Sequence, residues 1–199
     1  MKRIVITGAG GQIGSELVTS LRERYGQEAV LATDIRPLPD AVSNAGPTAI
    51  LDVQDQAAVA QTIRSHDADT IFHLAAILSA VGEENPSKAY TINMGTLRSV
   101  LEVARQGDYS VFTPSSIAVF GPTSPKQNTP QNTIMRPTTM YGITKVAGEL
   151  LCDYYYRKYG VDTRGVRYPG LISYGAPPGG GTTDWAVDIF IQAIQCFIS

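Results

Sequence analysis

The sequence contains few cysteines and no excess of either charge, and each shortage excludes a class of protein. Cys152 and Cys196 are the only cysteines among the 199 residues, and their wide separation fits no metal or redox motif. A disulfide-rich secreted domain is therefore excluded, and both thiols are expected to be free in a reducing compartment. The formal net charge of −2 gives no general attraction to nucleic acid or to an anionic membrane.

Long hydrophobic runs are also missing. No run reaches the roughly 18 consecutive apolar residues that a membrane-spanning helix needs. The N-terminus enters an apolar segment directly and lacks the layout of a signal peptide. These absences predict a soluble, cytoplasmic protein that binds neither membrane nor nucleic acid. The composition is ordinary, with 43% hydrophobic residues, and the length is sufficient for one full-sized domain with a core.

The most informative stretch is residues 1–14. Residues 2–7 (KRIVIT) have the composition of a strand buried on both faces, residues 8–14 (GAGGQIG) form a glycine-rich turn, and a helical pattern follows. Strand, turn and helix in this order are typical of a site for a dinucleotide pyrophosphate. Gly8 would permit the tight turn, Gly11 would let the phosphates approach the backbone, and Gly14 would let the helix pack closely. Gln12 and Ile13 complete the predicted turn.

An acidic residue lies where such a site needs one. Asp34 follows Gly14 by twenty residues and ends the second apolar run. A carboxylate there accepts hydrogen bonds from the adenosine ribose and repels a 2′-phosphate, which favours NAD. Arg36, two residues further on, keeps NADP open as an alternative. In an open α/β sheet, ligands bind beyond the carboxyl ends of the strands, so further cofactor contacts are expected at the next strand ends. These contacts are Asp52, Val53, Leu74, Ala75 and Ala76.

Apolar runs alternate with helical patterns along the chain, which predicts an α/β fold with a Rossmann-like, doubly wound parallel sheet. Strands are expected at residues 2–7, 29–34, 48–53, 69–76, 109–114 and 161–168. Helices are expected at residues 15–25, 55–65, 85–106, 138–159 and 185–197. His66 is expected at an exposed helix end, and His73 is expected to be buried and neutral, without a catalytic role. No metal site is predicted.

A hydroxyl pair and a Tyr-Lys pair suggest chemistry. Ser115 and Ser116 follow the fifth predicted strand, and Tyr141 and Lys145 lie four residues apart on the next long helix, so that they share one face. The Lys145 ammonium is expected to lower the pKa of the Tyr141 phenol. Tyr141 would then accept a substrate hydroxyl proton as hydride leaves for the cofactor, while Ser116 holds the substrate oxygen.

Several stretches between residues 7 and 170 resemble, in order, the motifs of the extended short-chain dehydrogenase/reductase family. They are residues 7–14 (TGAGGQIG), residues 73–76 (HLAA), Asn93, Ser115–Ser116, residues 141–145 (YGITK) and residues 167–170 (RYPG). The resemblance implies that Asn93 supports the active-site helix beside the cofactor, and that Tyr168, Gly170 and Ile172 pack near the nicotinamide. It also implies a homodimer formed through the helices at residues 86–106 and 138–159.

Within this family, the chain is most similar to short-chain-type L-threonine 3-dehydrogenases. Four segments carry this resemblance: residues 78–83 (LSAVGE), 114–122 (PSSIAVFGP), 138–142 (TTMYG) and 181–185 (GTTDW). Such enzymes oxidise the L-threonine hydroxyl with NAD and produce 2-amino-3-ketobutyrate. The resemblance gives Ser79, Ser116, Tyr141, Thr182 and Thr183 as substrate contacts.

Members of the family carry a C-terminal lobe that closes over the substrate, and this chain departs from that pattern. Residues 1–172 are expected to form the NAD-binding domain, and residues 173–199 only the start of a truncated substrate lobe. Two alternatives therefore stay open beside a threonine dehydrogenase. One is a nucleotide-sugar epimerase or dehydratase that uses the same Tyr141 and Lys145. The other is a non-catalytic NAD-binding module, because water exclusion usually needs the missing lobe.

Overall fold

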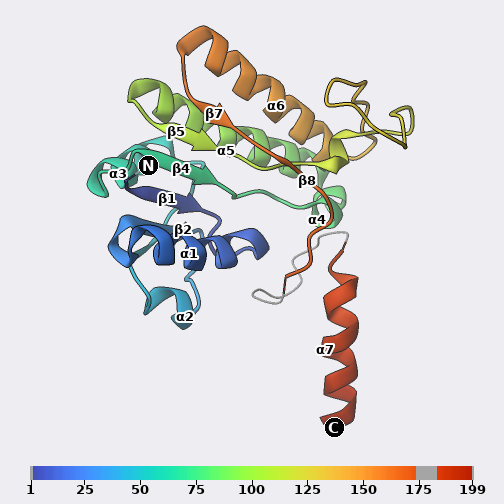
Figure 1. Cartoon of the computed structure of the whole chain (residues 1–199), viewed down its shortest axis with the longest axis horizontal. Coiled ribbons are helices and arrows are strands. Elements are labelled where there is room, and N and C mark those ends of the chain that lie inside the picture. Colours follow the sequence, from blue (N-terminus) through green and yellow to red (C-terminus); the bar gives the residue numbers. More distant parts are fainter. Residues whose placement is uncertain (1, 174–182, 199) are drawn as a thin grey trace.

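The computed structural model describes residues 2–173 and 183–198. Its centre is a six-stranded parallel sheet in the order β3-β2-β1-β4-β5-β7 (Figure 1). The strands are β1 (Ile4–Thr7), β2 (Val30–Asp34), β3 (Thr48–Ile50), β4 (Thr70–His73), β5 (Ser110–Phe112) and β7 (Thr163–Arg164). From β1 the chain builds outward to β3 and then returns to place β4 on the other side of β1. The Rossmann-like α/β prediction is confirmed, and the switch point between β1 and β4 is where such sheets bind ligands.

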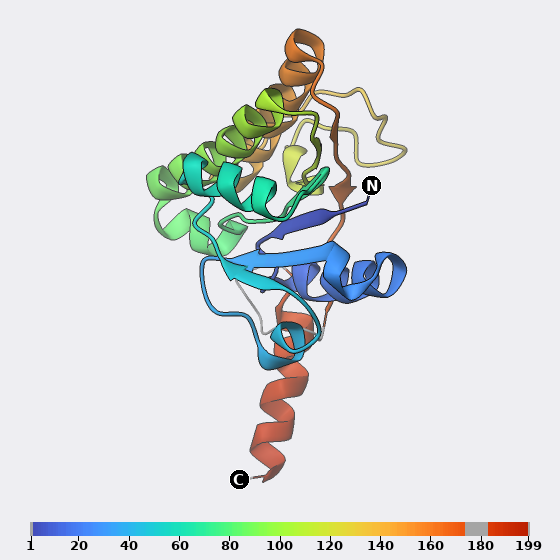
Figure 2. The same cartoon turned by 90° about the vertical axis from the view of Figure 1, so that its left-hand side faces the viewer.

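Helices cover both faces of the sheet. The helices are α1 (Gln12–Tyr25), α2 (Asp40–Ser43), α3 (Gln56–Ser65), α4 (Ser79–Glu84), α5 (Pro86–Gln106), α6 (Met140–Tyr159) and α7 (Trp185–Ile198). Figures 1 and 2 show α1 on one face, and α3, α5 and α6 on the other. The core divides in the same way, because alternate residues of β1 point to opposite faces: Ile4 and Ile6 pack with α1, and Val5 packs on the α5 side.

Local sequence signals explain why the long helices begin and end where they do. The Asp55 carboxylate caps α3 by accepting from the backbone N–H groups of Ala57 and Ala58, each at 3.0 Å. Asn85 caps α5 by accepting from Lys88 N at 3.1 Å, and Pro86 occupies the first turn. Gly160 ends α6 in the left-handed conformation, with φ of 73°.

One predicted strand divides into two. The chain expected to run as a strand over residues 161–168 forms β7 and then β8 (Arg167–Tyr168), which pairs with β6 (Ser115–Ser116) in a separate two-stranded parallel sheet. The division falls at Gly165, where an added Cβ would lie 2.6 Å from the carbonyl oxygen of Thr113. This close approach leaves no room for a side chain at position 165. Beyond this point β6 and β8 pair with each other outside the main sheet. Sequence patterns also missed α2 and α4, which are too short to show a helical period.

Two further expectations have different outcomes. His66 ends α3 as expected, but the prediction that it is exposed is wrong, since only 7% of the residue is accessible. Its Nε2 lies 3.3 Å from the carbonyl oxygen of Ala29, and its Nδ1 lies 3.3 Å from Arg3 Nη2. Cys152 is a free thiol, as predicted, and is buried, while Cys196 is exposed.

The last helix differs from the others in its surroundings. α7 projects away from the sheet in both ribbon views (Figures 1 and 2), and Trp185 and Phe190 are about 70% exposed. Among the described residues, no helix combines the length and apolar character needed to cross a bilayer. Within the same ranges, no group of three or more His, Cys, Asp or Glu side chains is arranged to hold a metal ion.

Candidate active site

The predicted cofactor residues of the first strands meet in one cleft at the switch point of the sheet. The cleft has a volume of about 360 Å³. The predicted residues that line it are Gly8, Gly11, Gln12, Ile13, Gly14, Asp34, Asp52, Val53, Leu74, Ala75 and Ala76. Residues up to 68 apart in the chain reach the same place only because the carboxyl ends of β1, β2 and β4 lie side by side.

The glycine turn has the close packing that a phosphate-binding turn requires. Gly8 has φ of +71°, and a Cβ there would lie 2.7 Å from the backbone nitrogen of Ala75. A Cβ on Gly14 would lie 2.4 Å from the carbonyl oxygen of Gly8, so α1 can begin so close to β1 only with glycine at this position. A Cβ on Gly11, in contrast, meets only Gly8 O, at 3.3 Å, and otherwise faces the cleft. The backbone of α1 therefore presents its positive N-terminus to a ligand.

Asp34 lies at the carboxyl end of β2 and at the edge of the cleft. Its Oδ2 accepts from the backbone N–H of Gly10 at 3.0 Å, and its Oδ1 accepts from the N–H of Arg36 at 3.2 Å. These bonds fix the carboxylate beside the glycine turn. The Arg36 residue also lines the cleft. An anion-binding helix terminus and a fixed carboxylate at one cleft suit the pyrophosphate and the ribose of NAD.

A second cleft of about 590 Å³ holds the predicted reacting groups. Gln12, Ile13, Leu74 and Ala76 line both clefts, so the two adjoin each other. The predicted residues of the second cleft are Ser79, Ser116, Tyr141, Lys145, Tyr168, Gly170 and Thr183. They come from α4, β6, α6, β8, the residues directly after β8 and the residues directly before α7. The structure therefore gathers the Ser, Tyr and Lys side chains next to the cofactor cleft.

Lys145 and Tyr141 contact each other through the ring face. The Lys145 Nζ lies 5.3 Å from the centre of the Tyr141 ring and donates a hydrogen bond to the carbonyl oxygen of Pro114 at 2.8 Å. Burial lowers the pKa of the Lys145 ammonium to about 8. The lysine is thus held in place by the strand end that precedes Ser115 and Ser116.

The expected direction of the Tyr141 shift is wrong for the chain alone. Burial raises the pKa of the Tyr141 phenol, and a hydrogen bond with Ser116 lowers it by a smaller amount. The physical reason is that Tyr141 is largely buried, while the Lys145 ammonium lies over the ring and directs a proton to Pro114.

Two buried residues, His73 and Asn93, form hydrogen bonds with the elements that carry the site residues. His73 lies at the end of β4, and its Nδ1 is 2.9 Å from Thr7 Oγ1. Burial lowers the pKa of His73 to about 3. The prediction that His73 is buried and neutral is therefore confirmed. Asn93 on α5 accepts from the N–H of Ile77 at 2.7 Å, and its Nδ2 donates to Ile77 O at 3.1 Å and to Thr144 Oγ1 at 3.3 Å. Asn93 thus links α5, α6 and the segment before α4.

Not every predicted residue lies in the clefts. Asn93 lines a third cavity, to which Lys145 also belongs, and neither of the two clefts. Ile172 is 68% exposed and lines neither cleft. Thr182 lies outside the described residues. The roles of these residues remain predictions that come from the resemblance.

Sequence reasoning missed two residues that hold the start of α6, next to the second cleft. Thr139 caps α6 by accepting from Gly142 N at 3.1 Å, and Glu83 of α4 accepts from Met140 N at 2.7 Å. The capping signal of Thr139, two residues before Tyr141, could have revealed the first contact. Glu83 carries no such signal, because its contact joins residues 57 apart in the chain. Together they fix the turn of α6 that carries Tyr141.

The doubly wound sheet, the glycine turn and the adjoining Ser-Tyr-Lys cleft define a dinucleotide-binding protein of the Rossmann type. The model of the NAD dependent epimerase/dehydratase family matches residues 4–195, and the chain belongs to this family. NAD is accordingly the cofactor of the family, in agreement with the carboxylate of Asp34 in the cleft.

Curated relatives and solved structures agree on the family and differ in their names. The chain is 57% identical over 98% of its length to an uncharacterized epimerase/dehydratase of Staphylococcus haemolyticus, of which it covers 62%. It is 56% identical to L-threonine dehydrogenase from Clostridium difficile, with a TM-score of 0.91 over 97% of this chain and 61% of that one. For the GalE-like L-threonine dehydrogenase from Cupriavidus necator in its holo form, the identity is 51%, the TM-score 0.91 and the coverage 97% and 62%. The chain thus spans about 62% of the length of such relatives.

Proposed function

We propose that the protein oxidises the side-chain hydroxyl of L-threonine with NAD and forms 2-amino-3-ketobutyrate. The observation that carries the proposal is the convergence of Ser116, Tyr141 and Lys145 in a cleft that adjoins the dinucleotide cleft. The similarity to L-threonine dehydrogenases at 51% to 56% identity supports an amino-acid substrate over a nucleotide sugar. Similarity to UDP-glucose 4-epimerase from Brucella ovis, at 24% identity, extends to the fold only.

In the proposed reaction, each side chain of the triad has a separate task. Ser116 donates a hydrogen bond to the substrate oxygen, and the Tyr141 phenolate accepts the hydroxyl proton as the carbinol hydride leaves. The nicotinamide of NAD supplies the hydride acceptor. Lys145 holds its positive charge beside the Tyr141 ring while it is anchored to Pro114. Burial raises the pKa of Tyr141 and so disfavours the phenolate that the reaction needs. A positively charged nicotinamide nearby would lower this pKa and favour the phenolate.

Ser79 and Thr183 are proposed contacts to the charged ends of the amino acid. Both line the same cleft as Tyr141, although they belong to segments about 100 residues apart in the chain. Thr183 Oγ1 donates to the carbonyl oxygen of Leu171 at 2.5 Å, which brings the start of the C-terminal segment against the residues that follow β8. We accordingly propose that residues 1–172 bind NAD and that residues 173–199 belong to the substrate lobe.

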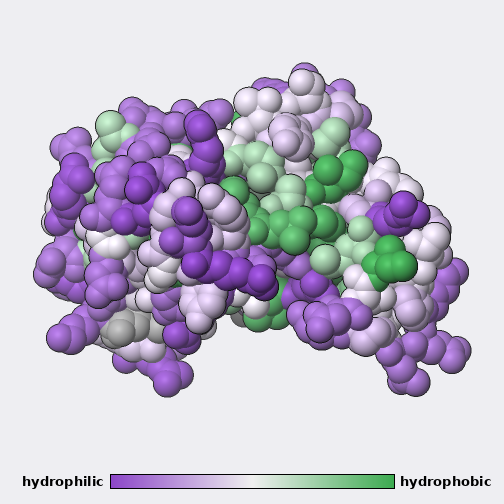
Figure 3. All heavy atoms as spheres, turned by 90° about the horizontal axis from the view of Figure 1, so that it is seen from above, coloured by the Kyte–Doolittle hydropathy of each residue, from purple (hydrophilic) through white to green (hydrophobic). Residues whose placement is uncertain are grey.

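A homodimer through α5 and α6 is part of the proposal, in a cytoplasmic enzyme. Figure 3 looks down on the α6 side of the molecule and shows apolar residues gathered toward the middle of this face. Tyr90 on α5 and Ile143, Leu150 and Tyr154 on α6 are between 42% and 61% exposed. Apolar side chains on two neighbouring helices suit an interface. One similar structure, an L-threonine 3-dehydrogenase, is described as monomeric.

The direct test is the appearance of NADH absorbance when the purified chain is mixed with NAD and L-threonine. L-threonine should give a steady signal, and L-serine, which lacks the methyl group, is the matched control substrate. Conversion of a UDP-sugar without any signal from L-threonine would replace the proposal by a nucleotide-sugar epimerase or dehydratase. NAD binding by calorimetry with no turnover of either substrate would indicate a binding module.

A further inference from the structure

The face of α6 that carries the proposed catalytic residues continues to a third polar side chain, Glu149. Tyr141, Lys145 and Glu149 are spaced four residues apart and so lie along one side of the helix. Glu149 lines a cavity of about 300 Å³ to which Lys145 also belongs, and it does not line the cleft that contains Tyr141. The Glu149 side chain is only 24% exposed, so its charge needs partners inside the protein.

Glu149 accepts hydrogen bonds from two neighbouring strands. Arg167 of β8 binds it in a bidentate manner, with Nε donating to Oε1 at 2.8 Å and Nη2 donating to Oε2 at 2.7 Å. The Ser115 hydroxyl of β6 also donates to Oε1. The same guanidinium donates from Nη1 to the carbonyl oxygen of Gln131 at 3.0 Å and lies 5.5 Å from the centre of the Phe120 ring. One ion pair thus joins α6, β6, β8 and the loop at residues 121–137.

The Glu149–Arg167 pair is largely withdrawn from water. The side chains of Arg167 and Glu149 are 15% and 24% exposed, respectively. Burial opposes the ionisation of Glu149, but the hydrogen bonds from Arg167 and Ser115 outweigh it and hold the pKa of the carboxyl below its ordinary value. Both partners are therefore charged near neutral pH, and loss of either would leave a buried charge without its partner.

Each partner of Glu149 is the direct neighbour of a residue in the proposed site. Ser115 precedes Ser116 in β6, and Arg167 precedes Tyr168 in β8. The two strands pair in register, with Ser115 opposite Arg167 and Ser116 opposite Tyr168. Along a strand, successive side chains point to opposite faces. Glu149 therefore forms its hydrogen bonds on one face of the β6–β8 sheet, and the Ser116 and Tyr168 side chains lie on the opposite face.

We propose that Glu149 and Arg167 are positioning residues, which set Ser116 and Tyr168 relative to the Tyr141 and Lys145 face of α6. The proposal rests on the proposed function for the roles of these four residues. β6 and β8 have only two residues each, so their own backbone hydrogen bonds are few. The ion pair supplies the connection to α6 that such short strands cannot supply alone.

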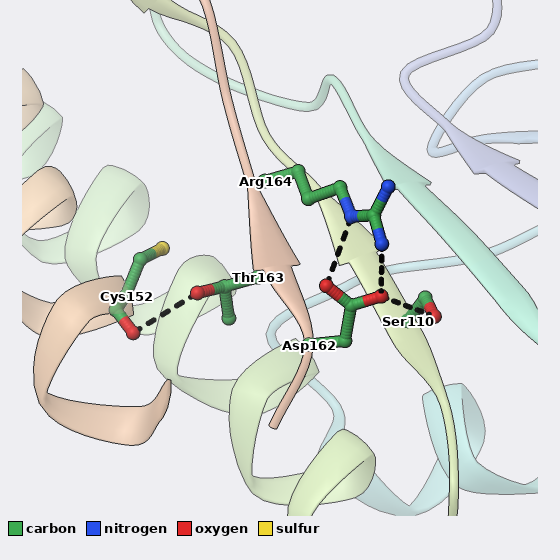
Figure 4. A network of polar contacts seen from close by, with 5 residues as sticks. All are labelled: Ser110, Cys152, Asp162, Thr163 and Arg164. Atoms are coloured by element: carbon green, nitrogen blue, oxygen red, sulfur yellow. Dashed lines mark hydrogen bonds and ion pairs between the residues drawn. The ribbon is translucent and has the colours of Figure 1, made fainter. Parts of the chain in front are cut away.

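The chain offers a matched control pair, shown in Figure 4. Arg164 of β7 also binds a carboxylate in a bidentate manner, with Nε and Nη2 at 2.9 and 3.0 Å from the two oxygens of Asp162. The Arg164 and Asp162 side chains are 76% and 43% exposed, and Asp162 bonds to Ser110 of β5. This pair has the same chemistry as Glu149–Arg167, but its side-chain hydrogen bonds to other described residues reach β5 and neither β6 nor β8.

The experiment compares Arg167→Met, Glu149→Gln and Arg167→Lys with the control Arg164→Met, all in the full chain. Kinetics with L-threonine should show kcat lowered about 100-fold by Arg167→Met and Glu149→Gln, because a small misplacement of reacting groups has effects of this size. The dissociation constant of NAD, measured by calorimetry, should change by less than about threefold, because the glycine turn is untouched. Arg167→Lys, which retains the charge, should restore part of kcat, and Arg164→Met should match the unaltered chain.

A second measurement does not depend on turnover. The fluorescence emission of bound NADH reports the surroundings of the nicotinamide, and its maximum should shift in Arg167→Met and stay unchanged in Arg164→Met. If the unaltered chain does not oxidise L-threonine, the proposed function fails, and the NADH emission still decides the role of the ion pair. Equal kcat and equal emission in Arg167→Met and Arg164→Met would overturn the inference. So would losses of kcat and of NAD affinity in equal proportion, which would indicate a merely structural role.

Discussion

A Cβ added to Gly14 would lie 2.4 Å from the carbonyl oxygen of Gly8, and this contact joins the start of α1 to the end of β1. No flexible side chain can move aside, because the neighbouring atoms belong to the backbone. Gly14→Ala should therefore lower the free energy of unfolding by about 3 kcal/mol in urea denaturation. Gly95→Ala on α5 is the control, since nothing lies within 4 Å of its added Cβ and alanine favours a helix.

Gly11→Ala should separate cofactor binding from stability. Its added Cβ meets only Gly8 O, at 3.3 Å, and otherwise enters the cleft where the phosphates would bind. We expect NAD affinity, measured by calorimetry, to fall at least about tenfold, which is about 1.4 kcal/mol, with the melting temperature nearly unchanged. Unchanged affinity would show that the pyrophosphate does not approach this turn.

Asp34 should determine the choice between NAD and NADP. Asp34→Asn removes the charge that repels a 2′-phosphate while it keeps the size of the side chain. NAD should bind about tenfold more weakly, because hydrogen bonds to a charged group are lost, and NADP should bind more tightly than before. Asp40→Asn, on the exposed helix α2, is the control and should alter neither dissociation constant.

Tyr141→Phe should retain NAD binding and lose turnover of L-threonine. Removal of a proton acceptor in the transition state is expected to lower kcat by about 10²- to 10⁴-fold. The ring remains, so its contact with the Lys145 ammonium is retained. Initial rates and NAD calorimetry on the same preparation measure the two properties. Loss of NAD binding would contradict the role assigned to this tyrosine.

His73 should make the fold sensitive to acid. Burial, with a smaller contribution from the Lys145 charge, lowers the pKa of His73 to about 3, whereas the unfolded chain has the ordinary value of 6.5. Between these values the unfolded state binds the extra proton, so stability falls as the pH falls from 6.5 towards 3, by up to about 1.4 kcal/mol per pH unit. His73→Gln cannot take up the proton, and its unfolding free energy between pH 5 and pH 7, a range of about 2 units, should depend less on pH.

Leu150 tests the proposed homodimer. It is 61% exposed on α6, and Leu150→Asp would place a charge within the proposed interface. Light scattering after size-exclusion chromatography should then show twice the chain mass for the unaltered protein and the monomer mass for the variant. Ile134→Asp is the matched control, because Ile134 is 63% exposed but lies in the loop at residues 121–137. A monomeric unaltered protein would contradict the dimer directly.

The parts of the site that the sequence predicted are those encoded by local patterns. The strand, glycine turn and helix at residues 2–25 were predicted because each signal depends on neighbours a few residues away. Asn85 and Gly160 mark helix ends for the same reason. The common face of Tyr141 and Lys145 follows from the helical repeat alone.

The errors concern quantities that depend on distant contacts. The exposure of His66 could not be read from α3, because it depends on Arg3 and Ala29. The pKa of Tyr141 rises because of burial, and burial is a property of everything packed around the ring. The division of residues 161–168 depends on the approach of Gly165 to Thr113, a contact between segments about 50 residues apart.

The sequence by itself determined the α/β class, the glycine turn with Asp34, and the Ser-Tyr-Lys set, since all of these follow from residue type and short spacing. Only the tertiary structure decided that Glu149, Ser115 and Arg167 meet behind that set, and that the two clefts adjoin. The physical reason is that helical and strand periods fix which residues share a face, whereas the packing of whole elements fixes which faces meet.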